Sequence, residues 1–481
     1  MEEKLRNSFG DMLVYKNPDY GKFFSALSLP SFLRDWLLMR FSDTSGEINK
    51  EEVTQYIRRT IPQKAQWSHI LYKMLHEFQR VKFLAKIKID FDTRNRIALF
   101  SLPDFGVPKK KGEAVVEWKV IEENQKYLLA PNEIWGILEM VCMEDETRGN
   151  NSYVLKLVGF KPFSPYVIDL NYYCEARNEF SVEEWIDILL SAIDYNPNGY
   201  ANITQKMTML SRLLPFVEKR VNLIELAPKG TGKSYLFSQL SKYGWLVSGG
   251  SISRAKMFYD ISKRANGLVS FYDYIAFDEI QSIRFTDESE MQGALKGYLE
   301  SPTGEFRVGD FRGTGEAGLI LLGNIDIERM NVNTNMFVEL PQGFHESALI
   351  DRFHGFIKGW DIPRMKESLK VNGWALNIEY FSEIMHLLRG EVVYRGVVDE
   401  LLRYPKNADT RDTEAIKRLC TGFLKLLFPN ITNSDNINLD EFQKYCLQPA
   451  IEMRRIIKTQ LGIIDYEYAG NDVPDIHLSK D

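Results

Sequence analysis

The eight residues from Ala227 to Ser234 have the types and spacing of a loop that binds phosphate groups, and they read Ala227-Pro228-Lys229-Gly230-Thr231-Gly232-Lys233-Ser234. Gly230 and Gly232 let backbone N–H groups turn towards phosphate oxygens, and the helix expected after the loop adds its dipole. Lys233 would contact the terminal phosphates, and the Ser234 hydroxyl would bind Mg²⁺. This Walker A pattern predicts binding of ATP with Mg²⁺, although Ala227 replaces the first consensus glycine.

Two further apolar runs end in polar residues that could meet this loop. Asp278 and Glu279 follow the run Tyr274–Phe277, and Asn324 follows the run Leu319–Gly323. We expect Asp278 to hold the Mg²⁺ shell and Glu279 to polarise the water that attacks the γ-phosphate. Asn324 would orient that water or sense the γ-phosphate; the alternative is an ordinary Gly-Asn turn at a strand end.

Two arginines are candidates for completing the site. A P-loop, an acidic pair and a later strand ending in Asn, followed by a helical segment, form the AAA+ pattern. Such ATPases typically work as rings, because an arginine of one subunit completes the site of its neighbour. Arg352 is the candidate arginine finger, and Arg411, at the start of an amphipathic helix, is the candidate sensor 2. The alternative for each is a surface ion pair.

A glycine-rich segment before the Asn324 strand alternates aromatic and basic residues. Residues 304–315 carry Arg307 and Arg312 around a Gly-Asp turn, which predicts a β-hairpin. In a ring such a hairpin would point into the pore, where the two arginines could contact a phosphate backbone. The alternative is a solvent-exposed hairpin whose arginines pair with nearby acids.

Charge is unevenly distributed along the chain, whose formal net charge is -6. Residues 1–111 carry 20 Lys and Arg against 13 Asp and Glu, and the remainder carries 40 against 53. The basic part is a candidate DNA-binding surface, although a solvated helix face would have the same composition. The candidate contacts in this part are Arg58, Arg59, Lys64, Lys86, Lys88, Lys109, Lys110 and Lys111.

Strand-like alternation separates two helical parts of the chain. Lys86–Phe91, Val115–Val120 and Tyr153–Val158 are expected strands, which makes a small β-barrel or a sandwich plausible, with the oligonucleotide-binding (OB) type as one candidate. We therefore expect an α/β AAA+ P-loop ATPase core with a helical lid, preceded by a helical plus small β-barrel (OB-like) N-terminal part. The expected segments are 1–85 (helical, candidate DNA-binding), 86–175 (β-rich), 176–385 (ATPase core), 386–465 (helical lid) and 466–481 (polar tail).

The composition, 44% hydrophobic and 26% charged, is typical of a folded soluble protein. The four cysteines lie far apart without a CxxC pair, which favours reduced thiols over disulfides or a zinc finger. With no apolar run of about 18–20 residues and no secretory signal, we expect a cytoplasmic protein without a membrane partner.

The chain resembles the BrxL family, the Lon-like AAA+ proteins of BREX phage-defence systems. The residues that carry this resemblance are Val269–Asp287, Tyr298–Ser301, Leu322–Asn324, Ile350–His354, Gly359–Pro363 and Arg411–Pro429. The resemblance implies a bacterial or archaeal ATPase that forms rings and binds DNA. It also implies an AAA+ core similar to that of minichromosome-maintenance helicases, which carry a hairpin before the sensor strand and an arginine finger.

Longer members of this family carry a C-terminal domain resembling the Lon protease. This chain ends about 20 residues after the helix expected at Ile451–Gln460, so we expect it to lack peptidase activity. Our leading hypothesis is an ATPase motor on double- or single-stranded DNA, a homo-hexamer or two stacked rings, with other BREX components as further partners. The alternatives are an ATP-dependent protein unfoldase and a DNA-bound scaffold whose assembly ATP controls.

Overall fold

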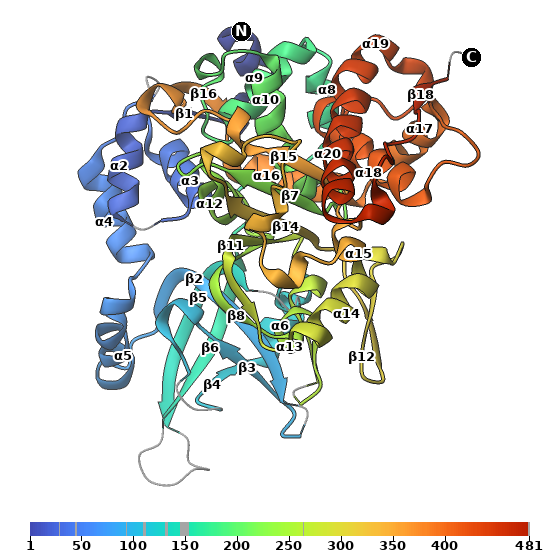
Figure 1. Ribbon diagram of the computed structural model, residues 1–481. Coiled ribbons are helices and arrows are strands. Elements are labelled where there is room, and N and C mark those ends of the chain that lie inside the picture. The colour runs from blue at the N-terminus through green and yellow to red at the C-terminus, as the bar shows by residue number, and fades with distance from the viewer. Residues whose placement is uncertain are drawn as a thin grey trace. The chain divides into compact units, whose positions relative to one another are not determined.

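The computed structural model describes residues 1–27, 29–43, 46–92, 94–108, 112–129, 133–144, 153–262 and 264–479 (Figure 1). Its contacts divide the chain into two compact units, each of which is described by itself. The P-loop unit consists of Met1–Met39 and Ile168–Asp481, and the barrel unit consists of Arg40–Val167. The DNA-contact candidates Lys109, Lys110 and Lys111 lie outside the described residues.

A sheet of five parallel strands forms the centre of the P-loop unit, in the order β15-β7-β14-β11-β8. Since all five strands point the same way, their carboxyl ends form one edge, here called the carboxyl edge, and their amino ends form the amino edge. The strands are β7 (Leu223–Ala227), β8 (Gly244–Ile252), β11 (Tyr274–Phe285), β14 (Gly318–Asn324) and β15 (Gly355–Lys358).

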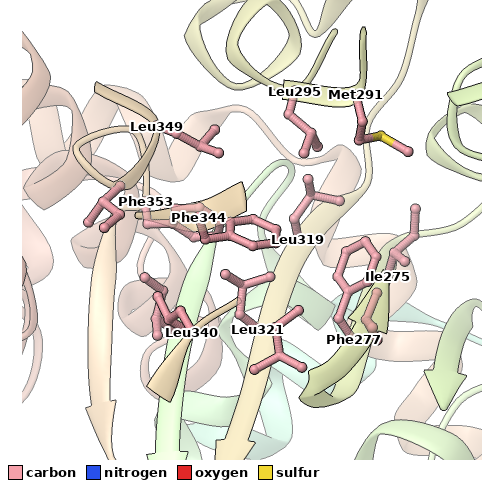
Figure 2. Packing of buried hydrophobic residues seen from close by; sticks show 14 of the residues in the cluster. Ile275, Phe277, Met291, Leu295, Leu319, Leu321, Leu340, Phe344, Leu349 and Phe353 are labelled. Atoms are coloured by element: carbon pink, nitrogen blue, oxygen red, sulfur yellow. The ribbon is translucent and has the colours of Figure 1, made fainter. Parts of the chain in front are cut away.

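One large apolar core lies against this sheet. Figure 2 shows Ile275 and Phe277 of β11 beside Leu319 and Leu321 of β14, and all four are almost completely buried. Leu295, from the helix α14 (Glu288–Glu300), packs into the same cluster. The near-continuous apolar composition of these strands is typical of a parallel sheet that is covered on both faces.

The helices of the P-loop unit begin and end close to the sequence signals. A capping box begins the helix that follows Ser181, because the Ser181 hydroxyl accepts from the Glu184 N–H and the Glu184 carboxylate accepts from the Ser181 N–H. The helices of eight or more residues are α1 (Glu2–Phe9), α2 (Pro18–Ala26), α3 (Ser31–Phe41), α8 (Leu170–Arg177), α9 (Val182–Ala192), α10 (Ile203–Leu210), α14, α16 (Ile378–Gly390), α17 (Val393–Leu401), α18 (Thr410–Leu427) and α20 (Gln448–Ile464).

The two ends of the chain belong to the P-loop unit. The strand β1 (Leu13–Lys16) pairs antiparallel with β16 (Gly373–Leu376), which ties the first 39 residues to the ATPase core. The expected helical segment 1–85 is thus divided between the two units. Near the other terminus, β18 (His477–Leu478) pairs with β17 (Leu402–Arg403), so the expected polar tail contributes one strand to a two-stranded sheet.

A closed five-stranded barrel with the order β2-β3-β4-β6-β5 forms most of the barrel unit, which confirms the expected small β-barrel. The helices α4 (Lys50–Thr60) and α5 (Trp67–His76) precede it. The strands are β2 (Val81–Asp92), β3 (Ile97–Ser101), β4 (Ala114–Val116), β5 (Ile134–Glu144) and β6 (Tyr153–Pro162).

One strand prediction is wrong in this unit. The run Val115–Val120 was expected to be a strand, but β4 ends at Val116 and the helix α6 (Trp118–Glu123) follows it. Val120 and Ile121 are consecutive residues that are both buried in the barrel core, which a helix allows and an alternating strand does not. A run of six residues is too short to distinguish the alternation of a strand from the periodicity of a helix.

Candidate functional site

The phosphate-binding loop lies at the carboxyl edge, between the end of β7 and the start of α12 (Lys233–Gln239). Gly230 and Gly232 have φ angles of 85° and 78°, the left-handed region that favours glycine. A Cβ on Gly232 would lie 2.1 Å from the Tyr195 hydroxyl, so this position has no room for a side chain. The backbone thus has the turn that the sequence predicted.

Ala227, the departure from the consensus, is accommodated by a glycine on the neighbouring segment. Gly359 faces it so closely that a Cβ on Gly359 would lie 2.2 Å from the Ala227 Cβ. The same segment continues along the loop, because the Met365 N–H donates to the Gly230 carbonyl over 2.7 Å. Gly359 begins the Gly-Trp-Asp-Ile-Pro run, which sequence reasoning could not connect to the site.

The structure brings Lys233 and Asn324 together. The Lys233 Nζ lies 3.4 Å from the Asn324 Oδ1 and 3.3 Å from the Ala227 carbonyl oxygen. Ala227 and Asn324 are also register partners at the ends of their strands. Burial lowers the pKa of Lys233, because a desolvated ammonium loses its hydration. A phosphate group in the loop would offset that penalty.

The two acids that follow Phe277 have different environments. Asp278 is buried, whereas Glu279 is exposed and has a φ of 48°, which is unusual for a residue with a side chain. The pairing of β11 with β8 shifts register between Asp278 and Ile283, and this irregularity turns Glu279 out of the strand. Backbone strain of this kind costs on the order of 1–3 kcal/mol and clusters at functional sites.

Gln281 is a residue of this region that sequence reasoning missed. Its Nε2 donates to the Asn324 carbonyl over 2.7 Å, and its Oε1 accepts from the Asn324 N–H over 3.4 Å. This pair of hydrogen bonds fixes the end of β14 against the irregular part of β11. No sequence signal distinguished Gln281 from an ordinary polar residue after a strand.

For Mg²⁺, the chain offers the Ser234 hydroxyl and the Asp278 carboxylate beside the loop. The described residues contain no group of three or more His, Cys, Asp or Glu side chains placed to hold a metal. This donor set fits Mg²⁺, which usually binds one or two protein oxygens and takes its other ligands from substrate phosphates and water.

A fully buried ion pair holds the loop through a hydrogen bond to its backbone. Sequence reasoning did not predict this pair. The Arg212 Nε donates to the Glu225 carboxylate over 2.9 Å, and its Nη1 donates to the Thr231 carbonyl over 2.8 Å. Both charged side chains are completely buried. The available signal was Glu225 itself, a lone acid inside the apolar run of β7, since buried charges require a partner.

Replacing Arg212 with Met is expected to lower the free energy of unfolding by about 3–5 kcal/mol, because Glu225 would stay buried without a counter-charge. Chemical denaturation followed by tryptophan fluorescence measures this change. The double variant R212M/E225M should regain most of the loss. Lys296→Met, which removes a more exposed pair with Glu346, should cost about 0–1 kcal/mol. Equal stability of R212M and the wild type would contradict this role.

The two candidate arginines lie together at the amino edge, opposite the P-loop. Arg352 comes just before β15, whose first residue Gly355 pairs with Leu223 at the start of β7. The P-loop begins at the other end of β7, about 13 Å away at about 3.3 Å per residue. Arg411, at the start of α18, bonds Asp351 over 3.1 Å.

Glu300, at the end of α14, holds both arginines and was not predicted. Its two carboxylate oxygens accept from Arg352 over 2.6 Å and from Arg411 over 2.9 Å. These hydrogen bonds lower the pKa of Glu300 below its usual range. The Arg352 Nε is buried and has no hydrogen-bond partner among the described residues.

The predicted hairpin is confirmed as β12 (Glu305–Val308) and β13 (Phe311–Thr314). Arg307 and Arg312 are cross-strand partners, and both are exposed. Neither has an ion-pair partner within the part of the chain that the structure describes, and their contact with a phosphate backbone stays a prediction. Phe306, the residue before Arg307, is buried.

The remaining basic candidates are spread over the barrel unit. Arg58 and Arg59 are exposed at the end of α4, and Lys64 is exposed in the turn before α5. Lys86 and Lys88 alternate with buried residues of β2, and Lys86 lies 3.6 Å from the Asp104 carboxylate. Their role in DNA binding stays a prediction.

Two family descriptions match this chain. Residues 7–141 match "BREX system Lon protease-like protein BrxL N-terminal", and residues 155–473 match "Lon-like protease BrxL-like, ATPase domain". The chain belongs to the BrxL family. Membership of this ATPase-domain family implies the AAA+ P-loop fold and ATP hydrolysis.

Two curated relatives carry the name Lon-like protease BrxL. The one from Escherichia coli O9:H4 (strain HS) is 29% identical over 441 residues, which cover 90% of this chain and 61% of that protein. The one from Bacillus cereus (strain H3081.97) is 27% identical over 483 residues, which cover 99% of this chain and 68% of that protein. This BrxL-family chain therefore spans about two thirds of the length of these relatives. No described helix has the length and hydropathy needed to cross a membrane.

Proposed function

We propose that this chain is a DNA-binding AAA+ ATPase of BREX antiphage defence that assembles into a ring, a hexamer or a dodecamer, and hydrolyses ATP to encircle DNA or move along it. The observation that carries this proposal is the position of Arg352 and Arg411 at the amino edge, with the P-loop at the carboxyl edge. Such arginines cannot reach the phosphates of their own subunit. Their position supports a role in completing the site of a neighbour.

The barrel supports the DNA-binding part of the proposal. We infer that it is of the OB type, a five-stranded Greek-key barrel that binds oligonucleotides. Its strand order, its single parallel pair between β4 and β6, and the helix between β4 and β5 support this inference.

An exposed aromatic pair on the barrel suits a nucleic-acid base. The rings of Phe91 and Trp118 are 46% and 50% exposed, and they stack on each other with centroids 6.2 Å apart. Arg94 and Arg96, in the turn between β2 and β3, are exposed without an ion-pair partner among the described residues. Aromatic faces and unpaired arginines together form the kind of surface that binds single-stranded nucleic acid.

The net charge of the barrel unit is small, so DNA binding would depend on local clusters of basic and aromatic side chains. Residues 40–167 carry 20 Lys and Arg against 17 Asp and Glu, while the rest of the chain carries 40 against 49. The basic excess thus belongs to the barrel unit, and the P-loop unit is acidic. We expect the isolated P-loop unit to hold DNA weakly.

The double variant F91A/W118A is expected to raise the Kd for single-stranded DNA about tenfold or more, because stacking contributes about 1–3 kcal/mol per base. The salt dependence of log Kd should stay unchanged, since no cation is lost. The variant R94A/R96A should instead reduce the slope of log Kd against the logarithm of the salt concentration by about two, because about two phosphate contacts are lost. Fluorescence anisotropy at several salt concentrations measures both effects.

Tyr466→Ala is the control for the aromatic variant, because Tyr466 is 93% exposed in the P-loop unit. It should bind DNA as the wild type does. A wild-type complex that is insensitive to salt would contradict DNA as the partner and favour a protein. Unchanged affinity of F91A/W118A would remove the barrel surface from the proposal.

The unfoldase alternative is less favoured by the hairpin. Unfoldases commonly contact polypeptides with aromatic pore loops. Here Phe306 is buried against Phe258, and Phe311 stacks on Tyr259 with ring centroids 3.5 Å apart. The exposed side chains of the hairpin include the two arginines, which suit phosphates better than an extended polypeptide.

A further inference from the structure

A cavity of about 900 Å³ lies beside the P-loop, within the P-loop unit. Gly232, Ser234 and Tyr235 form the wall on the loop side, together with Tyr195. The opposite wall comes from the N-terminal residues 16–38, which lie about 200 positions earlier in the sequence. Its volume is in the range of about 300–1,000 Å³ that is typical of small-molecule sites.

A network of buried charges fixes the N-terminal wall to the P-loop helix. Asp194 accepts hydrogen bonds from Lys16 over 2.8 Å, from Arg34 over 2.8 and 2.9 Å, and from the Tyr235 hydroxyl over 2.5 Å. Ser31, at the start of α3, lies 2.8 Å from the same Tyr235 hydroxyl. The wall is therefore built onto the residue that directly follows Ser234.

The network has two carboxylates and two cations, so its charges balance. Burial alone would raise the pKa of Asp194, but Arg34 and Lys16 hold it well below its usual range. Asp35, which is completely buried, pairs with both cations over 2.6 and 3.3 Å. Asp194 also has a φ of 74°, so the backbone turns sharply just before Tyr195.

The cavity is lined mainly by apolar and aromatic surface, with a few polar groups. Tyr20, Phe24 and Leu38 line it from the N-terminal wall, and Met365 lines it from the segment that bonds the P-loop. The Tyr195 hydroxyl is buried and has no hydrogen-bond partner among the described residues. Apolar and aromatic walls with a few polar groups are typical of small-molecule and cofactor sites, and they suit a purine with its ribose.

We propose that this cavity holds the purine base and ribose of the nucleotide whose phosphates the P-loop binds, so that residues 16–38 form part of the ATPase site. The inference rests on the proposed ATP site and adds to it the position of the nucleoside. In Figure 1, α3 lies beside α12, in agreement with the hydrogen bonds from Ser31 and Arg34 to Tyr235.

Gly21 offers a direct way to fill the cavity. It lines the cavity from α2, and a Cβ built on it meets no atom within 4 Å. Gly21→Phe should therefore place a ring in the cavity without displacing the protein, and it should weaken Mg²⁺–ATP binding at least tenfold. Inorganic tripolyphosphate, which has no nucleoside, should bind the variant within twofold of its affinity for the wild type. Isothermal titration calorimetry of the full chain measures both.

Two controls separate this inference from the proposed function. Gly396→Phe adds the same ring to an exposed helix position with open space and should leave both affinities unchanged. Lys233→Ala should lose both ligands. Normal ATP binding by G21F would overturn the nucleoside site alone, while failure of the wild type to bind tripolyphosphate and ATP would overturn the P-loop site and this inference with it.

A photolabelling experiment needs no variant and does not depend on folding of G21F. With 8-azido-ATP bound to the wild type, irradiation should label tryptic peptides that contain residues 16–38. Excess ATP should suppress the label. Labelling confined to other parts of the chain would place the base elsewhere and overturn the inference.

Discussion

Replacing Glu279 with Gln is expected to lower kcat for ATP hydrolysis about 10²–10⁴-fold while ATP stays bound, because a carboxamide cannot polarise the attacking water. Glu279 is exposed at the end of the apolar part of β11 and is turned outward by the register shift. Gln keeps the size of the side chain, so the P-loop and its phosphate contacts should remain intact. Phosphate release and fluorescent-nucleotide binding measure the two properties separately.

Lys233→Ala is the companion variant, and it should lose ATP binding as well as hydrolysis. Its ammonium is buried beside Ala227 and Asn324, where a phosphate is the natural counter-charge. Glu328→Gln changes an exposed acid of the same unit and should hydrolyse ATP at the wild-type rate. Wild-type turnover in E279Q would remove Glu279 from the chemistry of hydrolysis.

Replacing Arg352 with Ala is expected to lower kcat about 10³-fold or more while each subunit keeps its affinity for ATP. The reason is the distance along β7, which separates the amino edge from the P-loop within one subunit. Arg411→Ala should have an effect in the same direction, since both guanidinium groups are held by Glu300. Steady-state hydrolysis and nucleotide titration check this prediction, and a loss of ATP affinity in R352A would contradict it.

Glu300 adds a feature to this account. Its carboxylate bonds both arginines within one chain, so the arginines must exchange Glu300 for a phosphate when a neighbour presents one. Charge-assisted hydrogen bonds of this kind are strong and geometrically specific, which keeps the two guanidinium groups side by side until that exchange. The ion pairs that Arg352 and Arg411 form are therefore compatible with a role in the neighbour's site.

Local patterns predicted the P-loop, the acidic pair, the strand ending in Asn324 and the hairpin, because each depends on residues that are consecutive in the chain. The contacts between distant segments were not predictable in this way. Arg212 pairs with Glu225 across 13 positions, and Gly359 faces Ala227 across 132. Nothing in the composition of residues 1–39 indicated that β1 would pair with β16 and join the P-loop unit.

The central claim is that each ATPase site is shared between two subunits, and mixing two inactive variants tests it most directly. Lys233→Ala chains keep Arg352 but cannot bind ATP, and Arg352→Ala chains bind ATP but lack the arginine. In mixed rings, junctions that join an intact P-loop to an intact Arg352 should restore hydrolysis well above the sum of the two variants measured alone. Activity that stays at that sum over all mixing ratios, in rings shown to contain both variants, would contradict the account.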